Sequence, residues 1–343
     1  MLETPSHANQ VPAAPLSLTE AHEIAWRIVE RLRAAVRGRD EVIDLLVVAL
    51  LADGHVLLED YPGSGKTTLA RALGESIEDD RPDDAIVAFR RIQFTPDLLP
   101  SDITGSNIFD PDTGRFVFRP GPVFAHVVLA DEINRTSPKV QSAMLEAMGE
   151  KQVTVDDHTH PLDELFFVVA TQNPIDLAGT YPLPSPQLDR FLFKIVMRHI
   201  AREAELEVLD QYPRRSLDLA AERPRVSRTQ VLQARRALRE QVHIDPLVKE
   251  ALVDTARAVR EDPRVLQGLS TRSLVLALPA LQAHALMRRR DYVAPEDLER
   301  LAVPLFLHRL ECTPGVEDRS VPLREALAPQ LERLARASLR RSA

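Results

Sequence analysis

The 343-residue sequence predicts an α/β fold, a mostly parallel sheet covered by helices, followed by a smaller all-helical domain. Two observations predict it. Up to about residue 200, short apolar runs typical of buried parallel strands alternate with segments of helical periodicity. Beyond that point every segment has helical periodicity, and prolines stand at or near the segment boundaries. We therefore expect a disordered tail over 1–17, an α/β core over 18–202 and a helical lid domain over 203–343.

Each expected element follows from the periodicity of its residues. Ser17 or Thr19 can cap a first helix that runs to about residue 35, and Asp40 can cap a second that ends near residue 52. Apolar runs predict the buried strands 55–59, 86–92, 127–130, 166–170 and 192–196. Apolar residues at helical spacing predict a helix from Lys66 and the helices 137–149, 202–212, 227–240, 246–260, 271–290, 295–309 and 322–341.

Charge and cysteine content narrow the classes of protein that this chain can be. Lys and Arg number 43 against 51 Asp and Glu, a net charge of −8, which argues against a surface built to hold nucleic acid or anionic lipid. Cys312 is the single cysteine, which excludes an intramolecular disulfide and a thiolate zinc site. Residues 1–16 lack a signal-peptide core, and the longest apolar run, 45–52, is too short to span a membrane. We expect a cytoplasmic protein with no membrane span.

The strongest chemical signal is a glycine-rich loop between the strand 55–59 and the following helix. Glycines let successive backbone N–H groups turn toward a phosphate and approach it closely. Lys66 can reach the β- and γ-phosphates of ATP, and the Thr67 hydroxyl can bind Mg²⁺. The candidate nucleotide-binding residues are Asp60, Tyr61, Pro62, Gly63, Ser64, Gly65, Lys66, Thr67 and Thr68.

Polar residues follow two other predicted strands. Asp131 and Glu132 end the run that starts at Val127. The carboxylate of Asp131 can hold Mg²⁺, and the carboxylate of Glu132 can polarise the attacking water. Asn173 ends a later run and can bond the γ-phosphate or position the water; the alternative is a turn former before a proline. Arg190 can neutralise charge in the transition state from a neighbouring subunit; the alternative is a surface ion pair with Asp189.

These blocks resemble the MoxR family of AAA+ ATPases. The resemblance runs from about Val36 to Leu310 and is carried by the stretches 95–105, 121–124, 131–135, 137–143, 170–174 and 179–184. It implies a P-loop AAA+ module in which the glycine-lysine loop is Walker A and Asp131 with Glu132 is Walker B. It further implies that Asn173 is sensor 1, that Arg190 is an arginine finger acting in trans, and that Arg272, within 268–273, is a sensor 2 residue touching the γ-phosphate from the lid.

The resemblance also carries expectations about function. It implies Mg²⁺-dependent hydrolysis of ATP to ADP and phosphate in a ring, usually a hexamer, that acts as a chaperone-like remodeller or activator of proteins with a von Willebrand factor A domain. Segments 105–123 and 151–165 resemble inserted hairpins that project toward the ring face or pore. Departures from the family pattern include Asp60 in place of the first loop glycine and Gly149 in place of an acid.

Three other functions compete with this one. The chain could be the motor subunit of a metal-chelatase-like complex, whose ATPase core is similar, or a nucleic-acid motor, against which the net charge counts. It could also be a nucleotide-gated scaffold without hydrolysis. Glu132, Asn173 and Arg190 together argue against a scaffold, because a switch needs no base to polarise water.

Overall fold

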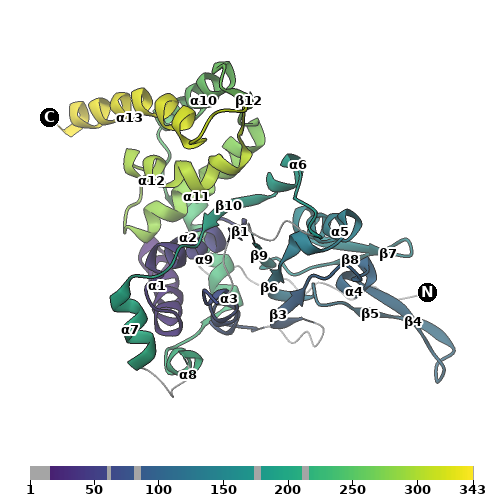
Figure 1. Ribbon diagram of the computed structural model, residues 1–343. Helices are drawn as coiled ribbons and strands as arrows, with labels where there is room; N and C mark the ends of the chain where they lie inside the picture. Colours follow the sequence, from purple (N-terminus) through teal and green to yellow (C-terminus); the bar gives the residue numbers. More distant parts are fainter. Residues whose placement is uncertain (1–15, 60–62, 81–85, 174–178, 211–215, 343) are drawn as a thin grey trace, which may run out of the picture.

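The computed structural model describes residues 16–59, 63–80, 86–173, 179–210 and 216–342 (Figure 1). Most of the tail expected over 1–17 therefore lies outside the described residues. Its last residue, Ser17, caps the first helix, α1 (Leu18–Ala35), because the hydroxyl of Ser17 accepts a hydrogen bond from the N–H of Glu20. The first helix thus begins at a capped residue.

Five parallel strands form the central sheet, and all five are expected from the sequence. They are β1 (His55–Glu59), β3 (Val87–Gln93), β6 (Ala125–Asp131), β9 (Phe167–Gln172) and β10 (Phe191–Val196). Their order across the sheet is β10-β1-β9-β6-β3. Since parallel strands end at the same edge, the segments that follow β1, β9 and β6 meet at one side of the sheet.

Helices cover both faces of this sheet, as the unbroken apolar runs of its strands predict. On one face, Val56 and Leu58 belong to the hydrophobic core formed with α1, α2 (Asp40–Leu51) and α3 (Lys66–Glu75). On the other face, Leu57 packs in a second core with α5 (Pro138–Glu150).

Two antiparallel hairpins extend from the end of the molecule remote from the C-terminal helix (Figure 1). After the short helix α4 (Pro100–Thr104), the first is made of β4 (Gly105–Asp110) and β5 (Arg115–Pro120), and the second of β7 (Gln152–Val155) and β8 (His158–Pro161). The Asn107 amide donates to the Asp156 carboxylate at 2.8 Å, and Phe118 stacks on His160 with ring centroids 3.6 Å apart. The two hairpins therefore support each other.

Helices dominate the second half of the chain. They are α7 (Arg202–Asp210), α8 (Ser216–Ala221), α9 (Arg228–Gln241), α10 (Pro246–Glu261), α11 (Thr271–Met287), α12 (Pro295–Phe306), the 3₁₀ turn η2 (Leu307–Arg309) and α13 (Ser320–Ser342). Buried residues of α9 and α11 join the same hydrophobic core as α1 and α2, so the helical half packs directly on the N-terminal helices. Among the helices of the described segments, none is long and apolar enough to cross a membrane.

Short elements connect these larger ones, and the sequence pattern does not predict them. The two-residue strands β2 (Ile77–Glu78) and β11 (Val226–Ser227) pair in parallel, and β12 (Val265–Gln267) pairs antiparallel with β13 (Glu311–Cys312). The turns η1 (Ile133–Arg135) and α6 (Ser185–Leu188) follow β6 and precede β10. A pairing of two residues is too short to produce a periodicity.

Candidate active site

The described part of the glycine-rich loop is shaped by two glycines in the left-handed region. Gly63 has a φ of +87° and Gly65 a φ of +90°, a conformation that strains any residue with a Cβ. A Cβ on Gly63 would meet no atom within 4 Å, and one on Gly65 would meet only Val36 Cγ1, at 3.8 Å. Among the described residues, no atom crowds the place of a side chain at either glycine. Asp60, Tyr61 and Pro62 lie outside the described residues.

Helix α3 begins at Lys66, directly after this loop. Its N-terminus has no side-chain cap and no acidic residue in the first turn. The first N–H groups of a helix point along its axis, and the helix dipole favours an anion at this end. A cradle of glycines, N–H groups and a lysine fits the phosphates of a nucleotide.

Asp131 lies at the carboxyl edge of the sheet, beside Lys66. Its carboxylate is 3% exposed and accepts a hydrogen bond from the Thr171 hydroxyl at 2.7 Å. Lys66 Nζ lies 3.8 Å from Oδ1, and the Arg91 guanidinium donates to Oδ2 at 2.6 Å. Three neighbours thus balance and orient this buried charge, which otherwise would be costly to hold out of water.

The chemistry of these oxygens fits Mg²⁺. This ion is usually held by one or two carboxylates together with substrate phosphates, and the rest of its shell is water. Asp131 and the hydroxyl of Thr67, in the first turn of α3, supply oxygens of this kind. In the described segments no group of three or more His, Cys, Asp or Glu side chains is arranged to hold a metal.

Glu132 adopts a backbone conformation that is rare for a residue with a side chain. Its φ is +58° and its ψ +49°, and its N–H donates to the Thr171 hydroxyl at 2.8 Å. The Gln93 amide donates to its carboxylate at 3.0 Å, and Arg135 Nε lies 3.1 Å from the same oxygen. Thr171, buried on β9, therefore fixes both acids at once, because one hydroxyl bonds the carboxylate of Asp131 and the backbone of Glu132.

Asn173 is brought to the same edge by the strand order. It follows β9, which lies between β1 and β6, and its neighbour Gln172 pairs with Glu59 at the end of β1. Asn173 is partly buried there. The proline that would make it a turn former, Pro174, lies outside the described residues.

A cavity of about 390 Å³ opens beside the glycine-rich loop. Gly63 and Ser64 form one wall, and Arg39 donates to the Ser64 carbonyl at 3.4 Å. The opposite wall combines apolar side chains with a few polar ones, as sites for small ligands do. Its residues are Met197, Arg198, His199, Ile200, Glu205, Val208 and Leu209. A purine base could lie against this apolar wall with its phosphates toward the loop.

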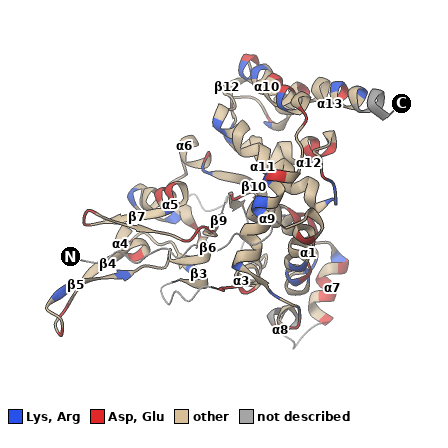
Figure 2. Ribbon diagram, turned by 180° about the vertical axis from the view of Figure 1, so that it is seen from behind, with Lys and Arg blue, Asp and Glu red and all other residues tan. Residues whose placement is uncertain are grey.

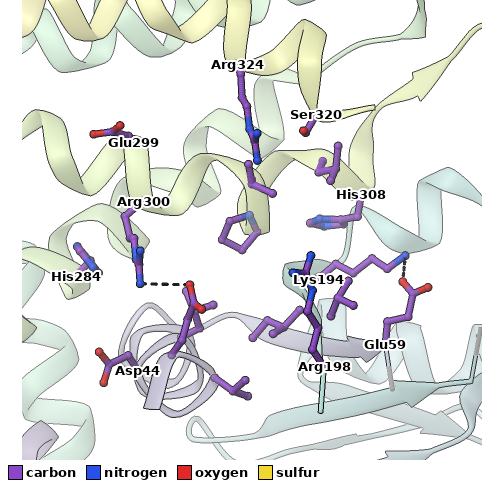
Figure 3. Close-up of a pocket in the computed structure, with 18 of the residues that line it drawn as sticks. Asp44, Glu59, Lys194, Arg198, His284, Glu299, Arg300, His308, Ser320 and Arg324 are labelled. Carbon is purple, nitrogen blue, oxygen red and sulfur yellow. Dashed lines mark ion pairs between the residues drawn. The ribbon is translucent and has the colours of Figure 1, made fainter. Parts of the chain in front are cut away.

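A larger cavity, of about 1220 Å³, lies between α2, β10 and the helices α12 and α13 (Figure 3). The residues that line both cavities are Arg39, Arg198 and His199. Lys194 of β10 forms an ion pair with Glu59, the last residue of β1, and Arg300 of α12 lies 3.3 Å from Glu41 of α2. This cavity is thus a cleft between the sheet and the helical half, walled by both.

Arg190 lies at the opposite edge of the sheet from the loop. It precedes Phe191, which pairs with His55, the first residue of β1. Its guanidinium donates to the carbonyl of Leu145 in α5 at 2.7 Å. Asp189 pairs instead with Arg309, whose Nε donates to the carboxylate at 2.7 Å. The alternative expected from the sequence, an ion pair between Arg190 and Asp189, is therefore not the contact that forms.

Arg272 is exposed near the start of α11, just after the capping residue Ser270. Burial lowers the pKa of Arg309, Asp189 opposes this effect, and the positive charge of Arg272 lowers the pKa further. The charge of Arg272 therefore acts on Arg309, which pairs with Asp189.

Several residues of this site escape sequence reasoning. Arg91 and Gln93, two apart on β3, reach Asp131 and Glu132 respectively, and Arg39 contacts the glycine-rich loop. Strand alternation places Arg91 and Gln93 on one face, and this spacing is the signal that could have pointed to them. Arg39 carries no comparable pattern.

Comparisons with known proteins find relatives over almost the whole chain. Residues 55–193 match the family described as "ATPase family associated with various cellular activities (AAA)", and residues 257–326 match the AAA lid domain. The chain is 43% identical to the uncharacterized protein YeaC of Bacillus subtilis (strain 168), over 94% of this chain and 98% of that one. It is 37% identical to Chaperone MoxR1 of Mycobacterium tuberculosis (strain ATCC 25618 / H37Rv), over 90% of this chain and 81% of that one.

A solved structure agrees with these matches. The crystal structure of a candidate ATPase from Cytophaga hutchinsonii ATCC 33406 superposes with a TM-score of 0.80 at 35% identity, and covers 92% of this chain and 95% of that one. The fold, the AAA and lid matches and the identity to Chaperone MoxR1 lead to the same conclusion. The chain belongs to the MoxR family of AAA+ ATPases.

Proposed function

We propose that this ATPase hydrolyses ATP between neighbouring copies of the chain. The observation that carries the proposal is the separation of two half-sites. The glycine-rich loop, Asp131, Glu132 and Asn173 lie at the carboxyl edge of the sheet, whereas Arg190 precedes β10 at the opposite edge. Arg190 lies far from the glycine-rich loop of the same subunit. It can serve catalysis if the neighbouring subunit places its glycine-rich loop beside Arg190.

Each residue has a role in this reaction. The first turn of α3 and Lys66 bind the β- and γ-phosphates, and Asp131 with Thr67 would hold Mg²⁺. When bound, Mg²⁺ offsets the negative charge of the phosphates. Glu132 accepts the proton of the attacking water, and Asn173 donates to the γ-phosphate.

The arginines complete the site from the neighbouring subunit. Arg190 stabilises the negative charge of the transition state, and Arg272 contacts the γ-phosphate. The charge of Arg272 acts on Arg309, which pairs with Asp189, and this supports a role beside Arg190 and therefore in the neighbour's site. We infer a closed ring of identical subunits, with six as the expected number.

The work done with this ATP is remodelling of a partner protein. The name of the relative Chaperone MoxR1 supports a chaperone-like role. The hairpin of β4 and β5 exposes Phe109, 51% accessible, and Phe116, 72% accessible, as a pair just before its polar turn, and this apolar pair suits contact with a client at the ring face or pore. We propose a partner with a von Willebrand factor A domain and a cytoplasmic location.

The alternative functions have less support. Figure 2 shows Lys and Arg interspersed with Asp and Glu along the described helices rather than gathered in one stripe. In the basic run 288–290, Arg288 lies 3.6 Å from Asp44 and Arg290 lies 2.6 Å from Asp297, so these arginines hold helices together. A nucleic-acid motor is therefore disfavoured. A metal-chelatase motor would share the ATPase chemistry, and no contact described above favours it.

Mixing two inactive variants tests the proposal. Arg190→Ala subunits keep a pocket but lack the arginine, and Lys66→Ala subunits keep the arginine but lack a pocket. Each variant alone is expected to lose most turnover, by about 10³-fold or more for the arginine. An equal mixture should hydrolyse ATP measurably, because some neighbours rebuild one complete site. If subunit exchange is demonstrated and the mixture remains inactive, catalysis between subunits is wrong.

A further inference from the structure

Arg309 of the helical half makes several contacts with the turn that carries Arg190. Arg309 ends η2 and is 4% exposed. Its Nε donates to the Asp189 carboxylate at 2.7 Å, and one terminal nitrogen donates to the Phe191 carbonyl at 2.7 Å. The other terminal nitrogen donates to the carbonyls of Leu192, at 3.3 Å, and Leu305. Arg309 thus contacts the residue before Arg190 and the two residues after it.

These contacts fix the turn more firmly than the contacts of Arg190 itself. The rigid fork of a guanidinium matches several acceptors at once, and a buried ion pair leaves both partners costly to separate. Arg190 contributes one described side-chain hydrogen bond, to the Leu145 carbonyl. The backbone of the turn is therefore set by Arg309, while the Arg190 side chain can exchange a neutral acceptor for a phosphate.

Gly149 gives the Arg190 side chain its place against α5. A Cβ at this position would lie 2.3 Å from the guanidinium of Arg190, so any larger residue would force that flexible side chain to move. The resting position of Arg190 consequently depends on one carbonyl and one glycine of α5, neither of which carries charge. Among the described residues, no acidic side chain forms an ion pair with Arg190, so its departure toward an anion breaks one neutral hydrogen bond.

The same 3₁₀ turn also faces the large cleft between the sheet and the helical half. Leu307 and His308 line this cleft, and the ring of His308 is among the side chains drawn there (Figure 3). His308 Nε2 lies 3.1 Å from the Phe191 carbonyl, the acceptor that Arg309 also uses. Burial keeps the pKa of His308 well below its ordinary value, so the neutral ring can donate this hydrogen bond. The wall of the cleft and the turn of Arg190 are therefore joined through the Phe191 carbonyl.

We propose that Arg309 is a positioning residue for Arg190, so that the lid of one subunit sets the reach of its arginine into the neighbour's nucleotide site. The proposal rests on the function proposed above, in which Arg190 acts between subunits. It predicts that loss of Arg309 impairs catalysis in the adjacent site and leaves the subunit's own nucleotide pocket intact.

The first test compares two lid arginines in the full-length chain. Arg309→Ala should bind ATP with wild-type affinity in calorimetry and lose about 100-fold in kcat, the loss expected when a reacting group is misplaced by about 1 Å. Arg333→Ala is the matched control, because Arg333 of α13 also forms ion pairs, but with Glu250 and Asp254 of α10. It should keep wild-type turnover. Equal kcat for Arg309→Ala and wild type overturns the proposal.

Mixing distinguishes positioning of Arg190 from a role in the subunit's own pocket. Arg309→Ala with Lys66→Ala should regain turnover, because the intact pocket of the former meets the arginine of the latter. Arg309→Ala with Arg190→Ala should stay inactive, because both lack a working arginine. Recovery in the second mixture, or its absence in the first, contradicts the proposal.

A gentler variant covers the case in which Arg309→Ala does not fold. Asp189→Asn keeps the shape and the acceptor oxygen of Asp189 but removes its charge. It should lower kcat about tenfold and bind ATP with wild-type affinity. Like Arg309→Ala, it should regain turnover when mixed with Lys66→Ala and not when mixed with Arg190→Ala. Wild-type turnover of Asp189→Asn refutes the proposal. The mixture of Arg190→Ala with Lys66→Ala tests the function between subunits by itself, so a failure confined to the Arg309 and Asp189 variants refutes only the positioning role.

Discussion

Replacement of Thr171 by valine removes one hydroxyl that the two acids of the candidate site, Asp131 and Glu132, share. Thr171 is fully buried, and valine has nearly the same shape, so the packing of β9 should survive. The change leaves the N–H of Glu132 without its 2.8 Å acceptor and the carboxylate of Asp131 without its 2.7 Å donor. Glu132 has a left-handed backbone, which costs about 1–2 kcal/mol in a residue with a Cβ, so its conformation depends on such contacts.

The size of the effect follows from these two bonds. An unsatisfied buried group costs about 1–3 kcal/mol, and if that cost falls on the competent conformation of Glu132, kcat drops roughly 5- to 150-fold. ATP affinity should change little, because Lys66 and the loop are untouched. Thr171→Ser is the matched control, since it keeps the hydroxyl, and it should retain most of the turnover.

The assay is steady-state phosphate release by wild type, Thr171→Val and Thr171→Ser at saturating ATP. Denaturant unfolding of each variant shows whether the protein remains folded. If Thr171→Val hydrolyses ATP as fast as Thr171→Ser, the hydroxyl does not position Glu132 and our interpretation of this contact is wrong.

Three further outcomes are expected. Lys66→Ala should abolish ATP binding in a calorimetric titration, because the phosphates lose the lysine of the loop; wild-type affinity would contradict the loop assignment. Chelation of Mg²⁺ should stop phosphate release, and restored Mg²⁺ should restart it, because phosphate charge then has its counterion again; turnover that persists in excess chelator would refute Mg²⁺ dependence. Burial lowers the pKa of His55 to about 4, so the unfolded chain binds a proton between about pH 4 and pH 6.5 that the folded chain does not. Between about pH 7.5 and pH 5 the free energy of unfolding should therefore fall by about 2 kcal/mol from this group, and His55→Gln should lose that part of the pH dependence in urea titrations.

Much of the fold follows from residue patterns because its strands are buried on both faces. The runs at β1, β6 and β9 are apolar at successive positions, which only a covered parallel strand requires. The two-residue strands β2 and β11 lack any period, and the helix expected over 295–309 ends at Phe306 before the 3₁₀ turn η2. Such endings depend on packing rather than on spacing.

In the candidate site, too, some residues can be placed from the sequence and others only from the structure. Lys66, Asp131 and Asn173 could be assigned to one edge of the sheet from sequence, because each lies at or after the end of a strand and parallel strands share an edge. The partners of these residues could not, since Arg91 meets Asp131 across 40 positions and Arg309 meets Asp189 across 120. These pairings depend on strand order and on how the helical half docks against the sheet, neither of which is set by local periodicity.

The most direct measurement of the central claim is phosphate release by Glu132→Gln. If Glu132 accepts the proton of the attacking water, the variant should bind ATP as tightly as wild type and release almost no phosphate, because an amide can hold the water but cannot take its proton. Glu146→Gln, an exposed acid on α5, is the control and should behave as wild type. Normal steady-state turnover by Glu132→Gln would contradict hydrolysis at this edge of the sheet.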